Sequence, residues 1–209
     1  MDSSVGGKTA IDIPEGKNLV GAFKQPKLVL CDTGALKSLP HDFLVDGMGE
    51  VVKYGMIKSD ELFGILMNHD INTVHEVMDD IIARCVAIKR DVVEADEFDK
   101  GERMLLNFGH TLGHSIEQYY HYTGISHGRA VAKGMEIITD LAEKRGMCRK
   151  GLTADLCGCL KKYELTRDIG PTPAQLGSAC MNDKKRDGSS IHVIICSDIG
   201  GENVSSRFQ

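Results

Sequence analysis

Apolar residues recur at three- and four-residue steps along most of the chain after Pro40, and this periodicity predicts helices. The clearest apolar stripe consists of Val74, Val77, Met78, Ile81, Ile82, Cys85, Ile88 and Val92. The helices expected from the pattern span residues 41–57, 71–95, 103–120, 128–146 and 150–162. The sequence therefore predicts a mainly α, multihelical domain.

Two short apolar runs have the length and the flanking turn residues of buried strands. Residues 27–31 (KLVLC) follow Pro26 and precede Asp-Thr-Gly, and residues 191–196 (IHVIIC) precede a second turn-like segment. Residues 1–26 are rich in glycine and polar groups, so we expect loops there that bring backbone close to a ligand.

One predicted helix carries polar side chains where a packing helix would carry aliphatic ones. Arg103, Asn107, His110 and His114 follow each other by four, three and four residues, a spacing that places them on one face. This face would offer a metal ligand or base together with anion-binding groups.

Composition excludes several classes of function. The net charge of -5 gives no indication of the clustered basic surface that nucleic acid binding requires. No run of about 18 apolar residues occurs, and the N-terminus lacks a targeting pattern, so we expect no membrane partner. The 7 cysteines form no CxxC pair, which favours reduced thiols in a soluble cytoplasmic protein.

Two lysines have spacings that allow either a functional or an ordinary interpretation. Lys8, in GGKT, could meet a phosphate or be a solvated loop lysine, although the P-loop fingerprint fails because Asp2 stands where a glycine is required. Lys89 lies beside the apolar stripe of its helix, so its ammonium group must reach solvent or meet an anion.

A metal site can be assembled from three segments of the sequence. His110 and His114 have the i, i+4 spacing that lets two imidazoles converge on one ion, although incidental surface histidines share this spacing. Glu50 shares a helical face with Lys53 in an apolar setting, where an exposed ion pair would be unusual. With His127, which opens the next helix, Glu50 and His110 would form the three-ligand, open site expected of catalytic zinc.

Six blocks of sequence extend this hypothesis to a known family. In chain order they are DSSVGGKTAIDIPEGKNLVGAFKQPKLVLCDT, LKSLP, GMGEVVKYGMI, LLNFGHTLGHSIE, SHGRAVAKGM and DKKRDG. Together they closely resemble the 3-dehydroquinate synthase family. The resemblance implies that residues 1–40 are a remnant of an α/β nucleotide-binding domain and that residues 41–209 form a helical metal- and substrate-binding domain.

The resemblance also assigns roles to individual residues. It implies that Glu50, His110 and His127 bind a divalent metal, zinc or cobalt, and that His114 transfers protons or contacts phosphate instead of binding the metal. The residues implied to contact substrate hydroxyls and carboxylate are Asp2, Lys53, Lys89, Arg103 and Asn107. The residues implied to surround the phosphate are Lys8, Asn18 and either Lys184 or Lys185. Lys8, Lys17 and Ser38 fall where the family approaches its NAD.

In this family, 3-deoxy-D-arabino-heptulosonate 7-phosphate is oxidised by NAD, loses phosphate, is reduced again and closes to 3-dehydroquinate. The reaction is a lyase step of the shikimate pathway towards aromatic amino acids, and the family's active enzymes are commonly homodimers. Because the family's nucleotide-binding half ordinarily precedes DSSVGGKT, we expect this chain alone to be deficient in NAD binding. The alternatives are a related cyclase with an inosose or valiolone product, and a non-catalytic metal-binding fragment that acts through a partner.

Overall fold

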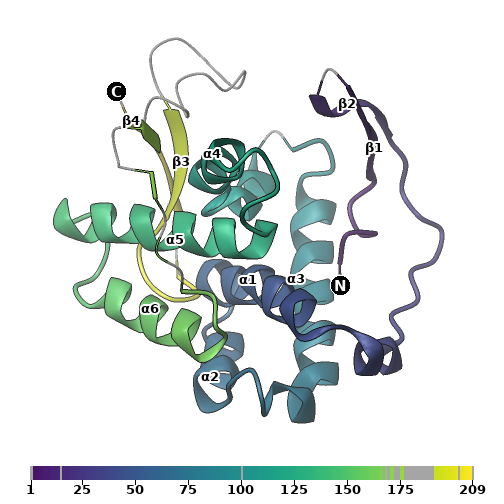
Figure 1. Cartoon of the computed structure of the whole chain (residues 1–209), viewed down its shortest axis with the longest axis horizontal. Helices are drawn as coiled ribbons and strands as arrows, with labels where there is room; N and C mark the ends of the chain where they lie inside the picture. The colour runs from purple at the N-terminus through teal and green to yellow at the C-terminus, as the bar shows by residue number, and fades with distance from the viewer. Residues whose placement is uncertain are drawn as a thin grey trace.

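The computed structural model describes residues 2–14, 16–99, 101–166, 168, 170–171, 175–176, 191–201 and 203–208. Most of these residues lie in helices, which confirms the mainly α prediction (Figure 1). The α-helices are α1 (His41–Lys58), α2 (Asp60–Asn68), α3 (Met78–Ala95), α4 (His110–Tyr119), α5 (His127–Lys144) and α6 (Leu152–Lys162). Shorter 3-10 helices span η1 (Thr33–Ser38), η2 (Val74–Val77) and η3 (Glu102–Asn107).

The helices α1, α5 and α6 lie where the apolar periodicity placed them, with ends shifted by at most two residues. Helix α2 was not expected as a separate element. It begins directly after α1 because the Ser59 hydroxyl accepts a hydrogen bond from the backbone N–H of Leu62 (3.1 Å), the usual interaction of a helix N-cap. This cap ends one helix and starts the next within two residues.

Two predicted helices are shorter than their apolar patterns suggested. In the segment 71–95 the first residues form a turn and η2, because the Asp70 carboxylate accepts hydrogen bonds from the N–H groups of Asn72 and Thr73. The segment 103–120 is broken between η3 and α4 at Gly109, whose φ of 76° is a left-handed conformation that favours glycine. The prediction that Arg103, Asn107, His110 and His114 share one helical face is therefore wrong.

The strands differ more from the prediction than the helices do. Residues 8–23 form an antiparallel hairpin of β1 (Lys8–Ile13) and β2 (Gly16–Phe23), where loops were expected. Residues 27–31 form no strand, since no strand among the described residues pairs with them. Leu28 and Leu30 are also not buried, with exposed fractions of 73% and 84%. The expected strand at 191–196 is present as β3 (Ile191–Cys196), which pairs with β4 (Asn203–Phe208).

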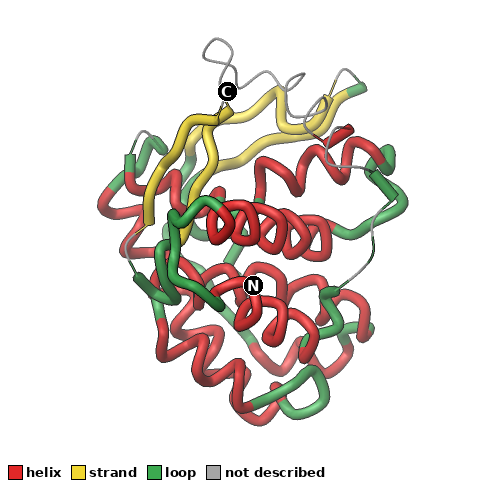
Figure 2. The backbone as a smooth tube through the Cα atoms, turned by 90° about the vertical axis from the view of Figure 1, so that its left-hand side faces the viewer, coloured by secondary structure: helices red, strands yellow, loops and turns green. Residues whose placement is uncertain are grey.

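The core lies between the helices, with α1 at its centre. Val45, Val52, Met56 and Ile57 of α1 have no exposed surface. Strands β3 and β4 cover one end of the helical layers (Figure 2), while β1 and β2 lie to one side of the helices (Figure 1). Among the helices of the described residues, none combines the length and the apolar character needed to cross a membrane.

Candidate functional site

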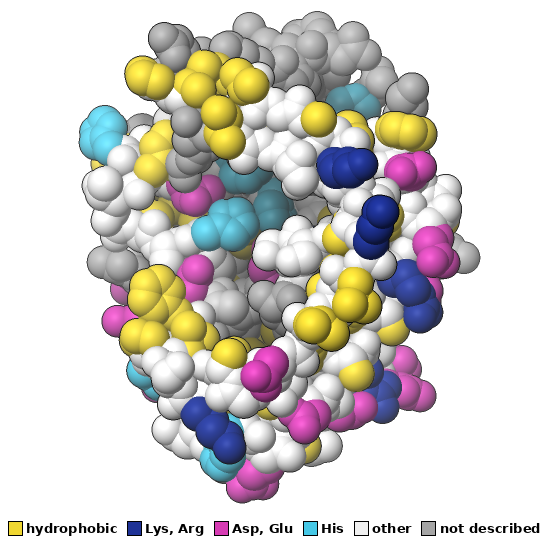
Figure 3. Space-filling model, turned by 90° about the vertical axis from the view of Figure 1, so that its right-hand side faces the viewer, with side chains coloured by type: hydrophobic (Ala, Val, Ile, Leu, Met, Phe, Trp, Pro, Cys, Tyr) yellow, Lys and Arg dark blue, Asp and Glu magenta, His cyan; other side chains and the backbone are white. Residues whose placement is uncertain are grey.

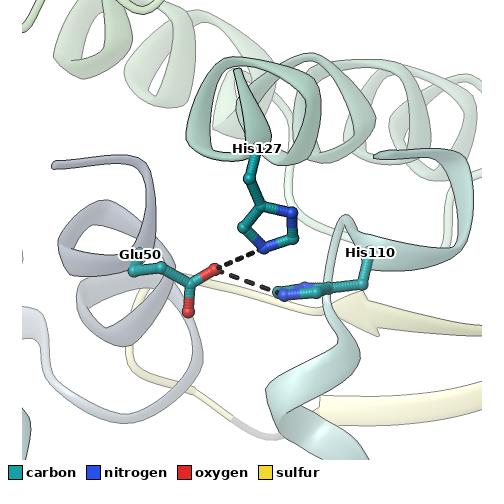
Figure 4. Close-up of side chains that lie close together, drawn as sticks. All are labelled: Glu50, His110 and His127. Carbon is teal, nitrogen blue, oxygen red and sulfur yellow. Dashed lines mark ion pairs between the residues drawn. The ribbon is translucent and has the colours of Figure 1, made fainter. Parts of the chain in front are cut away.

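Three helices each contribute one partly buried side chain to a single point where the helices meet. Glu50 comes from α1, His110 is the first residue of α4, and His127 is the first residue of α5 (Figure 4). The helices approach closely because glycines line their crossings: a Cβ atom at Gly49 would lie 2.5 Å from the carbonyl oxygen of Gly128. The residues next to Glu50 and His127 in sequence thus allow their helices to meet.

A carboxylate on α1 also fixes where α5 begins. Ser126 is the N-cap residue of α5 but makes no side-chain capping hydrogen bond. Instead, Asp46 accepts a hydrogen bond from the backbone N–H of Gly128, with an N–O distance of 2.6 Å. This contact ties the first turn of α5, and with it His127, to the helix that carries Glu50.

The atoms that face each other are the ones a metal ion would need. The Glu50 Oε1 atom lies 3.2 Å from His110 Nε2 and 3.7 Å from His127 Nε2. The three ligand atoms all lie within 4.8 Å of one another. A carboxylate and two imidazoles with room for a further ligand form a donor set typical of catalytic zinc.

The hydrogen bonds behind the two imidazoles favour a cation between them and Glu50. His110 Nδ1 lies 3.1 Å from the Phe108 carbonyl oxygen, and His127 Nδ1 lies 3.3 Å from Glu117 Oε2. Since both partners only accept, each ring donates from Nδ1, and the contact with Glu117 raises the pKa of His127. In its neutral form each ring then presents the lone pair of Nε2. Glu50 Oε1 is buried and receives no hydrogen bond. With both rings neutral, a carboxylate oxygen and two nitrogen lone pairs converge on one point, and this set of donors fits a divalent metal.

The groups around Glu50 keep its carboxylate ionised, which is the form that binds a cation. Lys53 Nζ lies 2.5 Å from Glu50 Oε2, and Lys53 is only 2% exposed, so this is a buried pair and not a surface ion pair. Burial alone would raise the pKa of Glu50, but the charge of Lys53 and the contact with His110 lower it well below its usual range. Burial lowers the pKa of His110, which keeps its ring neutral.

His114 lies beside the three converging side chains. Its ring centroid is 5.7 Å from that of His110 and 6.1 Å from that of His127, with which it is stacked. It is half-buried, one helical turn beyond His110 on α4. The structure thus brings both imidazoles of the sequence motif to the site and leaves His114 outside the set nearest Glu50.

Asp2 and Lys89 meet in a buried network next to α1. The Tyr54 hydroxyl donates a hydrogen bond to Asp2 Oδ2, and Lys89 Nζ donates to the Asp2 carbonyl oxygen at 2.7 Å. Lys89 Nζ also lies 3.4 Å from Asp2 Oδ2. Of the two possibilities that the sequence left open for Lys89, the structure therefore favours contact with an anion.

Arg103 and Asn107 lie on η3 and take different positions. Arg103 is buried, and its guanidinium donates to the carbonyl oxygens of Glu97 (2.7 Å) and Gly6 (2.8 Å). It thereby fastens the glycine-rich segment before β1 to the segment after α3. Asn107 lines a small cavity with Leu112 of α4 and Val193 of β3.

Two of the predicted phosphate and NAD residues, Lys8 and Ser38, have described side-chain contacts, and neither contact is with Glu50, His110 or His127. Lys8 is exposed and pairs with Asp99, with a Nζ–Oδ2 distance of 2.5 Å. Ser38 donates a hydrogen bond to the Ala35 carbonyl oxygen within η1. The structure does not describe the side chains of Lys17 and Asn18, and Lys184 and Lys185 lie outside the described residues.

Glu117 was missed from the sequence, although its spacing could have revealed it. It follows His110 by seven residues and His114 by three, which places it on the same face of α4. On the face of the molecule shown in Figure 3, histidine side chains lie in a central hollow with acidic groups beside them. Glu117 itself is buried, and its carboxylate contacts the ring of His127.

Comparison with known proteins decides the family. A model of the 3-dehydroquinate synthase C-terminal family matches residues 47–186, and a model of the 3-dehydroquinate synthase N-terminal family matches residues 1–46. The chain belongs to the 3-dehydroquinate synthase family. Members of this family named 3-dehydroquinate synthase include a Clostridium perfringens protein, 48% identical over 202 residues, and a Clostridium acetobutylicum protein, 46% identical over 214 residues.

These relatives are longer than the chain. The alignments cover 96% and 99% of this 3-dehydroquinate synthase family chain but only 58% and 60% of the C. perfringens and C. acetobutylicum proteins. Solved structures of related cyclases share the fold. One is 2-deoxy-scyllo-inosose synthase with carbaglucose-6-phosphate, NAD+ and Co2+ (TM-score 0.86, 26% identity, 99% of this chain and 60% of that chain). Another is the Streptomyces hygroscopicus 2-epi-5-epi-valiolone synthase with NAD+ and Zn2+ (TM-score 0.88, 24% identity, 100% and 59%).

Proposed function

We propose that this chain supplies the metal- and substrate-binding residues of a 3-dehydroquinate synthase, which converts 3-deoxy-D-arabino-heptulosonate 7-phosphate to 3-dehydroquinate and phosphate. The observation that carries the proposal is the convergence of Glu50, His110 and His127 from three helices, with Nε2 of both rings facing Glu50 Oε1. Membership of the family and identities of 46–48% to proteins of that name support the choice of reaction.

The proposed cofactors are a divalent metal, zinc or cobalt, and NAD. Glu50, His110 and His127 would hold the metal, which supplies Lewis-acid polarisation of a substrate alcohol, while NAD supplies reversible hydride transfer. The two cyclase structures that share the fold contain NAD+ with Co2+ or with Zn2+, which supports this choice. Lys8, Lys17 and Ser38 remain the residues proposed to approach NAD.

The roles proposed for the other polar residues rest on the family resemblance and, for His114 and Lys53, also on their positions. His114 stacks on His127 at the edge of the metal ligands, where an imidazole can hold or move a proton of the bound substrate. Lys53 offsets negative charge beside Glu50, and Asp2 and Lys89 form one buried polar network. We assign the substrate carboxylate to Lys89, Arg103 and Asn107. The phosphate is assigned to Lys8, Asn18 and either Lys184 or Lys185.

A second candidate is a related sugar phosphate cyclase that makes an inosose or valiolone product. The fold match to 2-deoxy-scyllo-inosose synthase at 26% identity favours keeping this candidate. The two candidates differ in whether the phosphosugar carries a carboxylate, so the preferred substrate distinguishes them. The cations at Lys89 and Arg103 favour the carboxylated substrate.

A chimera tests the proposal, because the chain matches only part of the longer relatives. We would replace the matching segment of the C. perfringens protein by this chain and measure phosphate release with NAD from the carboxylated substrate and from phosphosugars without a carboxylate. We expect release from the carboxylated substrate, and its loss in His110→Ala together with the metal. His75→Ala is the control, because this exposed histidine bonds only its own turn at the Asn72 carbonyl oxygen. A folded, metal-loaded chimera without phosphate release would leave only a non-catalytic metal-binding role.

A further inference from the structure

Glu117 is a buried acid that touches a metal ligand but stands outside the set around Glu50. It is 7% exposed, and its Oε2 atom lies 3.3 Å from His127 Nδ1. The opposite nitrogen of the same ring, Nε2, faces Glu50 Oε1 at 3.7 Å. His127 therefore lies between two carboxylates, one on each of its nitrogens.

His127 depends on such a partner more than His110 does. The His127 side chain is 44% exposed, whereas the His110 side chain is 14% exposed and its Nδ1 bonds the Phe108 carbonyl oxygen two residues away in its own chain segment. Packing and local backbone thus hold the ring of His110. For His127, the contact with Glu117 is the described interaction that holds Nδ1.

We propose that Glu117 is a positioning residue that sets the tautomer and the ring orientation of His127 and thereby the metal affinity of the site. A neutral imidazole carries one proton, and a carboxylate at Nδ1 keeps the proton there, so the lone pair of Nε2 stays available for the ion. Without this acceptor the proton can move to Nε2. The Nε2–H group then donates a hydrogen bond to Glu50, and its lone pair is no longer available to the metal. The inference rests on the proposed metal-binding function and adds a residue to it.

A competing role for Glu117 is direct ligation of a second ion. Ligand atoms of His114, Glu117 and His127 also lie within 4.8 Å of one another. Two ions sharing the ring of His127 would need both of its nitrogens deprotonated, which is unfavourable for an imidazole near neutral pH. The contact between Glu117 and His127 already uses Nδ1, so the positioning role agrees better with the geometry.

Metal affinity of the whole chain measures the effect without any enzymatic assay. We would titrate the metal-free protein with zinc against a chromophoric chelator and record the visible spectrum of the cobalt form. Glu117→Ala should weaken zinc binding ~10–100-fold and change the cobalt spectrum, as loss of a carboxylate behind a ligand histidine does. Glu117→Gln should weaken it less, because its amide oxygen still accepts from Nδ1.

Ser115→Ala is the matched control, because Ser115 is a buried polar residue of the same helix whose hydroxyl donates to the Thr111 carbonyl oxygen. It should leave zinc affinity unchanged. Wild-type protein that binds no zinc would overturn the metal site itself. Zinc bound equally by wild type, Glu117→Ala and Glu117→Gln would overturn only the role of Glu117. Two ions per wild-type chain and one in Glu117→Ala would show that Glu117 is a ligand. If Glu117→Ala does not fold, Glu117→Gln decides.

Discussion

Buried charges beside the proposed metal ligands are held in direct contact with a partner. Lys53 is paired with Glu50, and Asp2 receives the Tyr54 hydroxyl and the Lys89 ammonium group. Burial raises the pKa of Tyr54, and the adjacent Asp2 carboxylate raises it further, so Tyr54 stays a hydrogen-bond donor at all ordinary pH values. This donor holds the segment before β1 against α1 and α3.

Tyr54→Phe tests this contact at the level of one hydroxyl group. We expect the free energy of unfolding to fall by ~1.5–3 kcal/mol, because a buried carboxylate loses a donor. Tyr163→Phe is the matched control: its hydroxyl is also buried but donates to a neutral acceptor, the Leu66 carbonyl oxygen, at 3.0 Å. That change should cost about 1 kcal/mol. Urea unfolding of both variants checks the comparison, and equal losses would contradict a charged acceptor at Tyr54.

Individual ligands could be predicted from sequence only where local spacing carries the signal. Glu50 and Lys53 share a helical face, and the sequence suffices to expect their contact. His114 has the i, i+4 spacing from His110 that would let both rings bind one metal. The ring that faces Glu50 Oε1 together with His110 is nevertheless that of His127. Spacing leaves both His114 and His127 open as partners of His110, because the choice depends on how α4 and α5 pack. The family resemblance is what excludes His114.

At the scale of helices, glycines decide how closely the ligand-bearing elements approach. A Cβ atom at Gly134 would lie 2.1 Å from the Gly109 carbonyl oxygen, and one at Gly49 would lie 2.5 Å from the Gly128 carbonyl oxygen. The first contact joins α5 to the start of α4, and the second joins α1 to the start of α5. The ligands His110 and His127 directly follow or precede these glycines in sequence.

Gly49→Ala tests the crossing of α1 and α5. The added methyl group meets backbone that cannot move alone, so α5 must shift and carry His127 away from Glu50. We expect zinc affinity to fall at least ~10-fold. Gly47→Ala is the control on the same helix: nothing lies within 4 Å of its Cβ position. It should keep zinc affinity and raise stability by ~0.5–1 kcal/mol. Unchanged zinc binding in Gly49→Ala would contradict the crossing.

The N-cap residue of α6 is Gly151, which has no side chain to cap the helix, and Glu143 of α5 caps it instead. The backbone N–H groups of Gly151 and Thr153 donate to Glu143 at 2.6 and 3.0 Å. The neighbouring Thr153 hydroxyl and these N–H groups lower the pKa of Glu143 to about 2, from an ordinary value of 4.5. Because the pKa of Glu143 is lower in the folded protein than in the unfolded chain, the ionised carboxylate stabilises the fold at pH values above 4.5. This contribution disappears as the pH falls from 4.5 to about 2.

Glu143→Gln should therefore destabilise the protein near neutral pH and make its stability depend less on pH across this acidic range. The measurement is urea unfolding at several pH values between 2 and 7, compared with wild type. Asp140→Asn is the control, since Asp140 is a half-exposed carboxylate of α5 that pairs with Lys144. A Glu143→Gln curve parallel to that of wild type would show that the carboxylate does not cap α6.

At the scale of the molecule, periodicity predicted the helices because most of them bury one apolar stripe against the rest of the protein. Periodicity did not predict the break at Gly109, because apolar residues continue from η3 across it into α4. Strand formation was harder to predict, because the tendency of a segment to form a strand depends on the surface against which it packs. The hairpin β1–β2 formed from glycine-rich sequence, while the strongly apolar residues 27–31 formed no strand among the described residues.

A metal ion bound by one residue from each of α1, α4 and α5 would tie the helical layers together, so its removal should be visible in global stability. A ligand that binds only the folded state at 100 times its Kd stabilises it by about 2.7 kcal/mol. For a chain of about 200 residues this corresponds to a rise in Tm of roughly 5–11 °C. Scanning calorimetry with saturating zinc and with a chelator should show this difference, while Glu50→Gln should melt at the same temperature in both. His75→Ala should retain the full shift, because it lies outside the ligand set. Equal Tm values for wild type with and without zinc would mean that the three helices close around Glu50 without a metal.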